Sequence, residues 1–442
     1  MIKNDKFLIF LGDIALLYIS LYAVLTARYG FSFQELDRTG DSLLVQHILP
    51  FTIIFIAWLI VFVIVGLYEK RTSIEAKKVY RKLWKAYALN AGIAITFFYL
   101  FPSFGIAPKF NLLFIVLISM LALFAWRVYL FRNSRETRSI LVLASGHEAE
   151  ELVVEFKRLG SKVLYMDSNL PTSTKDELSK LLVGHGHIDW GIIDFNCAKI
   201  EEYLPVLYNT LYKGVEYTDI CNVYESVFER IPLSLIDHGW FIKYVSVKGR
   251  TVYDFLKRSM DIVASIILLP IYLITIPFVW LLIKLDDNGP LYVSQERIGR
   301  GNKVFSVKKY RSMNVNDGGK WPEKNDSRIT KVGKFLRKSR IDEIPQLISV
   351  LKGDVSLIGP RPDIIDLGKE LVAQVPYYSM RNSINPGLSG WAQIKQDVPP
   401  HSLEETKLRL SYDFYYIKNR SLFLDVIIAL RTIRTLASRL GR

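Results

Sequence analysis

Five long apolar runs constrain this chain more than any other feature of its sequence. They cover about residues 7–26, 48–68, 86–104, 110–131 and 262–283. Runs of about 20 apolar residues have the length of a helix that crosses a bilayer. Half of the residues are hydrophobic and the mean hydropathy is +0.20, which is unusual for a soluble protein. The sequence therefore predicts a membrane protein whose first region, 1–137, forms four transmembrane helices.

Basic residues predict how these helices are oriented. The segment 69–85 carries seven Lys and Arg residues, whereas the segments after the first and third runs carry far fewer. By the positive-inside rule, the N-terminus, this segment and everything after Arg132 lie on the cytoplasmic side. The first run lacks a small-residue cleavage site, so we expect it to be retained. It contains Asp13, which has two interpretations: a functional group or a packing hydrogen bond between helices.

The segment 138–248 has the rhythm of a small α/β domain. The stretch SILVLASG reads as a buried strand and turn, EAEELVVEFKRLG as a helix stopped by Gly160, KVLYMD as a second strand and DWGIIDF as a later one. This alternation predicts a Rossmann-like domain with a parallel sheet. Only Gly146 follows the first strand, although a dinucleotide-binding loop needs further glycines. Asp167 ends the second strand, where a ribose-binding acid would stand, so nucleotide binding stays open beside a scaffolding or regulatory role, which we favour.

The fifth apolar run has basic residues on both sides. Lys257 and Arg258 precede it, and Lys284 begins a series of cations after it, so both flanks read as cytoplasmic. Pro270 and Pro277 can interrupt the helix. We therefore expect a re-entrant helix over about 258–284 that dips into one leaflet and returns. The alternative is an ordinary kinked fifth span.

Two adjacent carboxylates, Asp342 and Glu343, follow a cluster of cations in the stretch RKSRIDEIPQL. Pro345 and Gly353 favour a short helix with Asp342 near its N-terminus, where the helix dipole and the cations should lower the pKa of Asp342. An ionised, fixed Asp is a competent nucleophile toward phosphorus. Glu343, together with Asp342, is the candidate ligand for Mg²⁺, a hard cation that prefers oxygen ligands and phosphates.

Further cations predict a phosphorylated substrate. Arg361 stands between two prolines in GPRP, and we name it with Lys309 and Arg311 as candidate phosphate-binding residues. The formal net charge is +14, which suits nucleic acid or anionic membranes and phosphorylated substrates. The membrane runs favour the second class and no nucleic acid. Cys197 and Cys221 are the only cysteines and form no metal-binding motif.

Several longer motifs follow one another in the last part of the chain: KRSMD, GPLYVSQERIG, KKYRSM, IDEIPQL, LKGDVSLIGPRP, PGLSGWAQ and YDFYYIKNRSLFLD. On these motifs the segment 253–436 resembles the bacterial sugar transferase family, the monotopic phosphoglycosyl transferases. The resemblance implies a mainly helical catalytic domain, here 249–442, in the bacterial inner membrane with its active site on the cytoplasmic face. It also implies transfer of a sugar 1-phosphate from a UDP-sugar to polyprenyl (undecaprenyl) phosphate. The large members of the family initiate exopolysaccharide, capsule or O-antigen synthesis.

The resemblance also implies residue roles. Asp342 would be the nucleophile of a two-step covalent mechanism, Glu343 would assist and help to hold Mg²⁺, and Arg337 and Arg361 would bind phosphate. The re-entrant helix would be anchored by Lys257, Arg258 and Asp261, with Pro270 and Pro277 shaping it. The family's Ser-Pro break is replaced here by Leu273 and Ile274, and its basic residue before Pro-Gly is replaced by Asn385.

Other hypotheses stay open at this point. A membrane-tethered nucleotide-sugar epimerase or dehydratase would need a glycine-rich cofactor loop, and a polysaccharide-assembly scaffold would need no catalysis. The sequence does not identify the sugar, and it leaves a homo-oligomer open.

Overall fold

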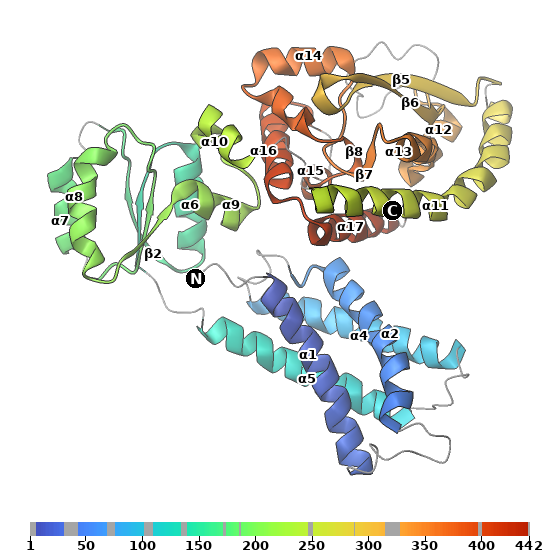
Figure 1. Cartoon of the computed structure of the whole chain (residues 1–442), viewed down its shortest axis with the longest axis horizontal. Coiled ribbons are helices and arrows are strands. Elements are labelled where there is room, and N and C mark those ends of the chain that lie inside the picture. Colours follow the sequence, from blue (N-terminus) through green and yellow to red (C-terminus); the bar gives the residue numbers. More distant parts are fainter. Residues whose placement is uncertain are drawn as a thin grey trace. The chain divides into compact units, whose positions relative to one another are not determined.

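The computed structural model describes residues 6–30, 43–68, 76–100, 109–133, 139–170, 174–184, 187–245, 251–286, 288–313, 328–396 and 400–440 (Figure 1). The chain divides into two compact units, Met1–Phe228 and Glu229–Arg442. Residues 229–245 lie in the second unit, although the sequence pattern grouped them with the α/β segment. The predicted domains themselves stay a prediction.

In its described residues the first unit begins with the helices α1 (Lys6–Tyr29), α2 (Leu43–Val65), α4 (Ala76–Leu100) and α5 (Lys109–Asn133). Helix α1 packs against α5, and α4 packs against both α2 and α5. Stretches long and apolar enough to cross a membrane lie in α1, α2 and α5, and a fourth lies in the second unit, at Leu8–Tyr29, Gln46–Val65, Phe110–Leu130 and Val252–Asp286. Helix α4 does not qualify within its described residues, because its first turns carry the basic residues that we expected in a loop.

Asp13 has a packing role in this helix bundle. Its side chain is fully buried, forms an ion pair with Arg127 of α5 at 2.5 Å and accepts a hydrogen bond from the Tyr68 hydroxyl at 2.8 Å. A buried carboxylate in a membrane helix needs such partners. The structure therefore favours the packing interpretation of Asp13 over a functional one.

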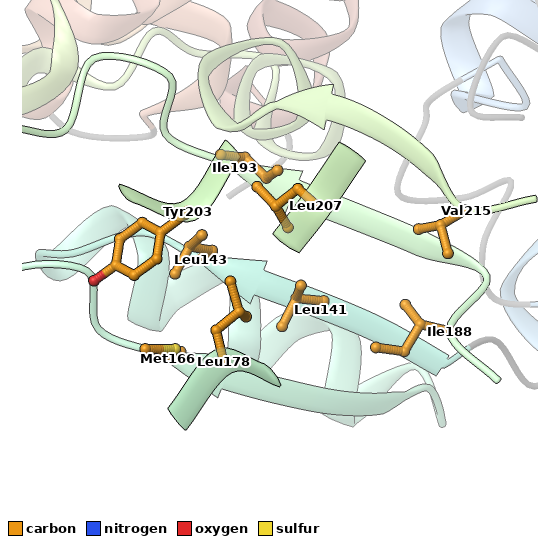
Figure 2. Close-up of a cluster of buried hydrophobic side chains, with 9 residues drawn as sticks. All are labelled: Leu141, Leu143, Met166, Leu178, Ile188, Ile193, Tyr203, Leu207 and Val215. Atoms are coloured by element: carbon orange, nitrogen blue, oxygen red, sulfur yellow. The ribbon is translucent and has the colours of Figure 1, made fainter. Parts of the chain in front are cut away.

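The α/β region of the first unit alternates strands and helices as predicted. Its elements are β1 (Ser139–Leu143), α6 (His147–Arg158), β2 (Lys162–Met166), α7 (Lys175–Gly184), β3 (Trp190–Ile193), α8 (Ile200–Leu211), β4 (Glu216–Asp219) and α9 (Ile220–Phe228). The strands are parallel in the order β2-β1-β3-β4. Figure 2 shows Leu141 and Leu143 of β1 in one apolar cluster with Leu178 of α7 and Leu207 of α8. The predicted parallel sheet is confirmed.

The described part of the second unit combines helices of very different lengths with two small sheets. After α10 (His238–Tyr244) and α11 (Thr251–Asp286), β5 (Tyr292–Ile298) and β6 (Val304–Tyr310) form an antiparallel hairpin. Two 3₁₀ turns, η3 (Leu233–Leu235) and η4 (Arg300–Asn302), belong to this part, and the later elements are α12 (Lys331–Ser339), η5 (Ile341–Gln346), α13 (Leu347–Lys352), β7 (Ser356–Ile358), α14 (Ile365–Gln374), η6 (Tyr378–Ser383), β8 (Gly387–Ser389), α15 (Trp391–Lys395), α16 (Leu403–Asn419) and α17 (Leu422–Leu440). Strands β7 and β8 form a parallel pair.

Helix α11 is one continuous helix through Pro270 and Pro277, so it ends at neither proline. Figure 1 shows it bending toward its C-terminal end, as prolines inside helices cause. Many large apolar side chains along it are exposed, among them Ile267, Ile274 and Phe278. The re-entrant course stays a prediction.

Polar contacts hold the first half of α11 to the rest of its unit. The Arg258 guanidinium donates to the carbonyls of Val350 and Leu351 at the end of α13, both at 2.6 Å. Lys257 pairs with Asp425 of α17 at 3.3 Å, and Asp261 accepts from the Leu357 amide of β7 at 3.1 Å. These three residues therefore fasten α11 to α13, α17 and β7.

The second half of α11 also packs on this unit. Val279 and Ile283 belong to a buried cluster with Tyr310 of β6 and Leu336 of α12. The last residue of the helix, Asp286, accepts a hydrogen bond from the Val332 amide at 3.0 Å. Both ends of α11 therefore contact the same compact unit.

Candidate active site

A cavity of about 1200 Å³ opens within the second unit. It is lined by all six residues that the sequence predicted for catalysis or phosphate binding, which are Lys309, Arg311, Arg337, Asp342, Glu343 and Arg361. The five predicted anchoring residues, Lys257, Arg258, Asp261, Pro270 and Pro277, do not line it, although other residues of α11 do. The structure thus gathers the predicted catalytic and phosphate-binding residues around one cavity.

A sharp turn delivers the two carboxylates to the cavity. Helix α12 ends at Ser339, and Arg340 adopts a left-handed conformation with φ 59°, which is uncommon for a residue other than glycine. The 3₁₀ turn η5 follows, with Asp342 and Glu343 in its first turn. As expected, Pro345 lies within this turn and Gly353 caps α13 with φ 96°.

Three cations surround Glu343. Its Oε1 accepts a hydrogen bond from Arg361 at 2.7 Å and lies 3.3 Å from Arg340 Nη1 and 3.5 Å from Lys309 Nζ. These positive charges, with Arg361 first, hold the pKa of Glu343 well below its usual range despite burial. Burial in turn lowers the pKa of Lys309 to about 8. Glu343 is therefore ionised and fixed in place.

Asp342 has a different environment. Its side chain is 8% exposed, and its Oδ1 is buried without a hydrogen-bond partner among the described residues. Burial and the negative charge of Glu343 raise the pKa of Asp342 to about 6, although Lys309, Arg340 and Arg337 act against this shift. Our expectation of a lowered pKa was wrong, because it counted the helix end and the cations but not the loss of water. At neutral pH the carboxylate is still mostly ionised.

Arg337 and Arg311 complete the cationic lining. Arg337, in the last turn of α12, has a buried Nη1 without a partner in the described part of the chain. Arg311 is buried and donates from Nε to the Met313 carbonyl at 3.2 Å. Gly289 makes room for it, because a Cβ at that position would lie 1.0 Å from Arg311 Nη1.

Comparison with known proteins shows which family this chain belongs to. Residues 252–439 match the family described as bacterial sugar transferase. Over 191 residues the chain is 36% identical to a UDP-glucose:undecaprenyl-phosphate glucose-1-phosphate transferase of Caulobacter vibrioides, covering 42% of this chain and 72% of that protein. The chain belongs to the bacterial sugar transferase family.

Two further relatives extend the comparison. A UDP-N-acetylgalactosamine-undecaprenyl-phosphate N-acetylgalactosaminephosphotransferase of Aeromonas hydrophila is 42% identical over 209 residues, which cover 47% of this chain and 49% of that protein. An undecaprenyl-phosphate glucose phosphotransferase of Komagataeibacter xylinus is 30% identical over 325 residues, which cover 68% of this chain and 59% of that protein. The chain therefore spans about half the length of these two curated relatives.

Sequence reasoning missed the residues that position Arg361 in this bacterial sugar transferase. The Arg361 carbonyl accepts a hydrogen bond from Nη2 of Arg381 at 2.9 Å. Arg381 is fully buried and also binds the carboxylates of Asp363 and Asp413, the latter at 2.8 Å from Nη2. Arg297 donates to the Pro362 carbonyl at 3.0 Å. Asp363 directly follows GPRP, but Arg297, Arg381 and Asp413 come from β5, η6 and α16, so no local pattern around GPRP revealed these three.

Asp342 and Glu343 are also the candidate ligands for Mg²⁺. Among the described residues no group of three or more His, Cys, Asp and Glu side chains is placed to hold a metal ion, so in that part of the chain Asp342 and Glu343 are the candidate pair. Mg²⁺ is commonly held by one or two carboxylates together with substrate phosphates. The buried, unpartnered Oδ1 of Asp342 is such a hard oxygen ligand, beside Glu343. The residues present therefore fit a magnesium ion that shares its coordination with a phosphorylated substrate.

Proposed function

We propose that this chain transfers a sugar 1-phosphate from a UDP-sugar to polyprenyl (undecaprenyl) phosphate, releasing UMP. The observation that carries the proposal is the contrast between the two adjacent carboxylates. Glu343 is bound by three cations, whereas Asp342 presents an unpartnered oxygen to a cavity lined by arginines and a lysine. An ionised carboxylate without a partner, surrounded by phosphate-binding cations, is suited to attack phosphorus.

The reaction then has two displacements. A carboxylate oxygen of Asp342 attacks the phosphorus that bears the sugar, the bond from that phosphorus to the bridging oxygen breaks, and UMP leaves with the electron pair. An oxygen of polyprenyl phosphate next attacks the same phosphorus, and the Asp342 carboxylate is released. The products are UMP and a polyprenyl diphosphate sugar. Arg361, Lys309 and Arg337 stabilise the negative charge of the phosphoryl oxygens in both steps.

The lining of the cavity supports a lipid-borne acceptor. Ala264, Leu268 and Ile271 of α11 and Ile433 and Leu436 of α17 line it together with the charged residues. An apolar wall formed by a helix with exposed apolar side chains suits a polyprenyl chain, while the cations suit its phosphate. Both substrates of the proposed reaction therefore have a matching part of one cavity.

Mg²⁺ is part of the proposal. Asp342 and Glu343 would hold it together with phosphate oxygens. When bound, the ion would neutralise charge on the diphosphate and so ease the approach of an anionic nucleophile.

The membrane topology is proposed on the same basis. Both ends of α11 contact elements of one compact unit, and basic residues flank its apolar stretch, which supports a re-entrant helix with the catalytic domain on the cytoplasmic face of the inner membrane. A variant without Cys197 and Cys221 should carry Val252→Cys or Asn288→Cys, both exposed positions. A membrane-impermeant thiol reagent should label both cysteines from the cytoplasmic side. Labelling of the two from opposite sides would show an ordinary span instead.

The test of the activity is UMP release from a panel of UDP-sugars by the detergent-purified full chain with Mg²⁺. We expect one sugar to give release that increases with polyprenyl phosphate. Asp342→Asn should abolish turnover, because the amide is no nucleophile, whereas Asp354→Asn, at an exposed position outside the cavity, is the matched control. A normal rate in the Asp342 variant would refute the nucleophile, and no release from any sugar would refute the reaction.

A further inference from the structure

A second unpartnered cation, Arg409 of α16, lines the same cavity as Asp342. Its guanidinium makes no hydrogen bond or ion pair with any described residue, and its Nη2 is shielded from solvent. A buried donor on a charged group that lacks a partner is costly, so such groups normally bind something. The mechanism above does not use Arg409, which leaves its ligand to be identified.

Nearby carboxylates do not satisfy this arginine. Asp363 and Asp413 lie within electrostatic range of Arg409, but both are bound by Arg381. The Tyr378 hydroxyl also donates to Asp363, at 2.9 Å. The N–H donors of the Arg409 guanidinium are therefore available to a ligand in the cavity. A phosphate matches these donors in geometry and charge.

Gln393 of α15 indicates that the ligand also carries a hydrogen-bond donor. It lines the same cavity, and although its Nε2 donates to the Leu388 carbonyl at 3.1 Å, its Oε1 is buried without a partner in the described part of the chain. An amide oxygen needs a donor. An ionised phosphate carries only acceptors, whereas a nucleoside carries ribose hydroxyls and, in uracil, a ring N–H. Helices α15 and α16 pack against each other, so both groups belong to one wall.

Arg297 extends the cationic lining toward this wall. It lines the cavity and lies within electrostatic range of Arg361, Glu343 and Arg409. Arg297, Arg361 and Arg409 together therefore supply positive charge to one cavity, which suits a ligand with two linked phosphates.

We propose that Arg409 and Gln393 bind the nucleoside monophosphate half of the UDP-sugar, with Arg409 on the phosphate of the leaving UMP and Gln393 accepting a hydrogen bond from the nucleoside. This inference rests on the proposed function, because it assigns the leaving group of that reaction to this wall. The polyprenyl phosphate, which has no nucleoside, should not depend on either residue.

The experiment measures UMP binding and UDP-sugar turnover with the full chain in detergent. Arg409→Gln should raise the Kd for UMP and the KM for the UDP-sugar by about 10- to 100-fold, the usual effect of removing a charge-assisted hydrogen bond. The KM for polyprenyl phosphate should change by less than about twofold, and Arg409→Lys should recover part of the UMP affinity. Lys407→Gln is the matched control, because it removes a half-buried cation of the same helix that does not line the cavity.

Competition with inorganic phosphate and uridine separates the two contacts. Arg409→Gln should weaken binding of phosphate and UMP, whereas Gln393→Leu should weaken binding of uridine and UMP but not of phosphate. Equal binding of phosphate and UMP by the unmodified protein would overturn the nucleoside contact.

Two results would overturn the role of Arg409. One is an unchanged Kd for UMP in Arg409→Gln together with a lower unfolding temperature, which would mean that Arg409 only balances Asp363 and Asp413. The other is an effect of the same size in Lys407→Gln. Failure of the proposed function is a separate result, since it would be seen as no turnover of any UDP-sugar by the unmodified protein.

Discussion

The acid limb of the pH profile provides the sharpest test of Asp342. With its pKa raised to about 6, the nucleophilic carboxylate should be lost as pH falls through that value. The ionised fraction is about nine tenths at pH 7 and about one tenth at pH 5, so the rate of the first displacement should fall about tenfold between them. An Asp with an ordinary pKa near 4 would lose less than about a tenth of its rate over the same interval.

The assay must isolate the first displacement. A phosphate monoester such as polyprenyl phosphate has a second pKa of about 6, which would produce a similar limb in steady-state turnover. Single-turnover release of UMP from the UDP-sugar, with enzyme in excess and without acceptor, avoids this overlap because the diphosphate diester does not titrate there. An acid limb centred near pH 4 in that assay would refute the burial argument for Asp342.

Glu343→Gln tests the cause of the raised pKa. The negative charge of Glu343 raises the pKa of Asp342, and Arg361, Arg340 and Lys309 lose their anionic partner when it is removed. Both effects favour the ionised form of Asp342, so the acid limb should move to lower pH even if the plateau rate falls. Asp354→Asn should leave the limb in place. A limb that moves to higher pH would contradict this electrostatic account.

Three further variants test the surroundings of the carboxylates. Arg361→Ala should lower kcat for UMP release by about 100-fold or more, because Glu343 loses its shortest ion pair and the phosphate loses a donor; a change below about threefold would exclude this role. Arg381→Met should lower the free energy of unfolding by about 3–5 kcal/mol, since it leaves two buried carboxylates without their cation, and a denaturant titration with an unchanged midpoint would contradict this. Gly289→Ala should displace the Arg311 guanidinium and lower kcat/KM on the order of 10- to 100-fold at unchanged unfolding temperature; full activity would show that Arg311 is dispensable.

The sequence was sufficient for features that depend on local pattern. Apolar runs of spanning length predicted α1, α2, α5 and α11, and strand-like runs alternating with polar helices predicted the parallel sheet. The stretch IDEIPQL predicted a carboxylate pair at the start of a short helix, because a proline and a following glycine mark the ends of such a turn.

The rest depends on contacts between distant parts of the chain. The direction of the Asp342 pKa shift follows from burial, and burial is decided by elements as far away as β6 and β7. Arg381 of η6 donates to the Arg361 carbonyl, and Arg409 of α16 lines the cavity. Neither residue stands in a sequence pattern that distinguishes it from an ordinary surface arginine. The sequence also did not decide whether α11 continues through Pro270 and Pro277, because a proline permits a helix to end but does not require it.

The geometry around Arg340 explains how two neighbouring carboxylates acquire different properties. Its left-handed backbone ends α12 and starts the 3₁₀ turn, while its guanidinium reaches forward to Glu343. Glu343 therefore faces three cations and stays ionised, whereas Asp342, one residue earlier, is buried beside that negative charge and keeps an unpartnered oxygen. Environments that push the pKa values of two carboxyl groups in opposite directions commonly mark a division of roles. Here the division assigns the fixed anion to organise the cations and the unpartnered carboxylate to react with the phosphorus that they bind.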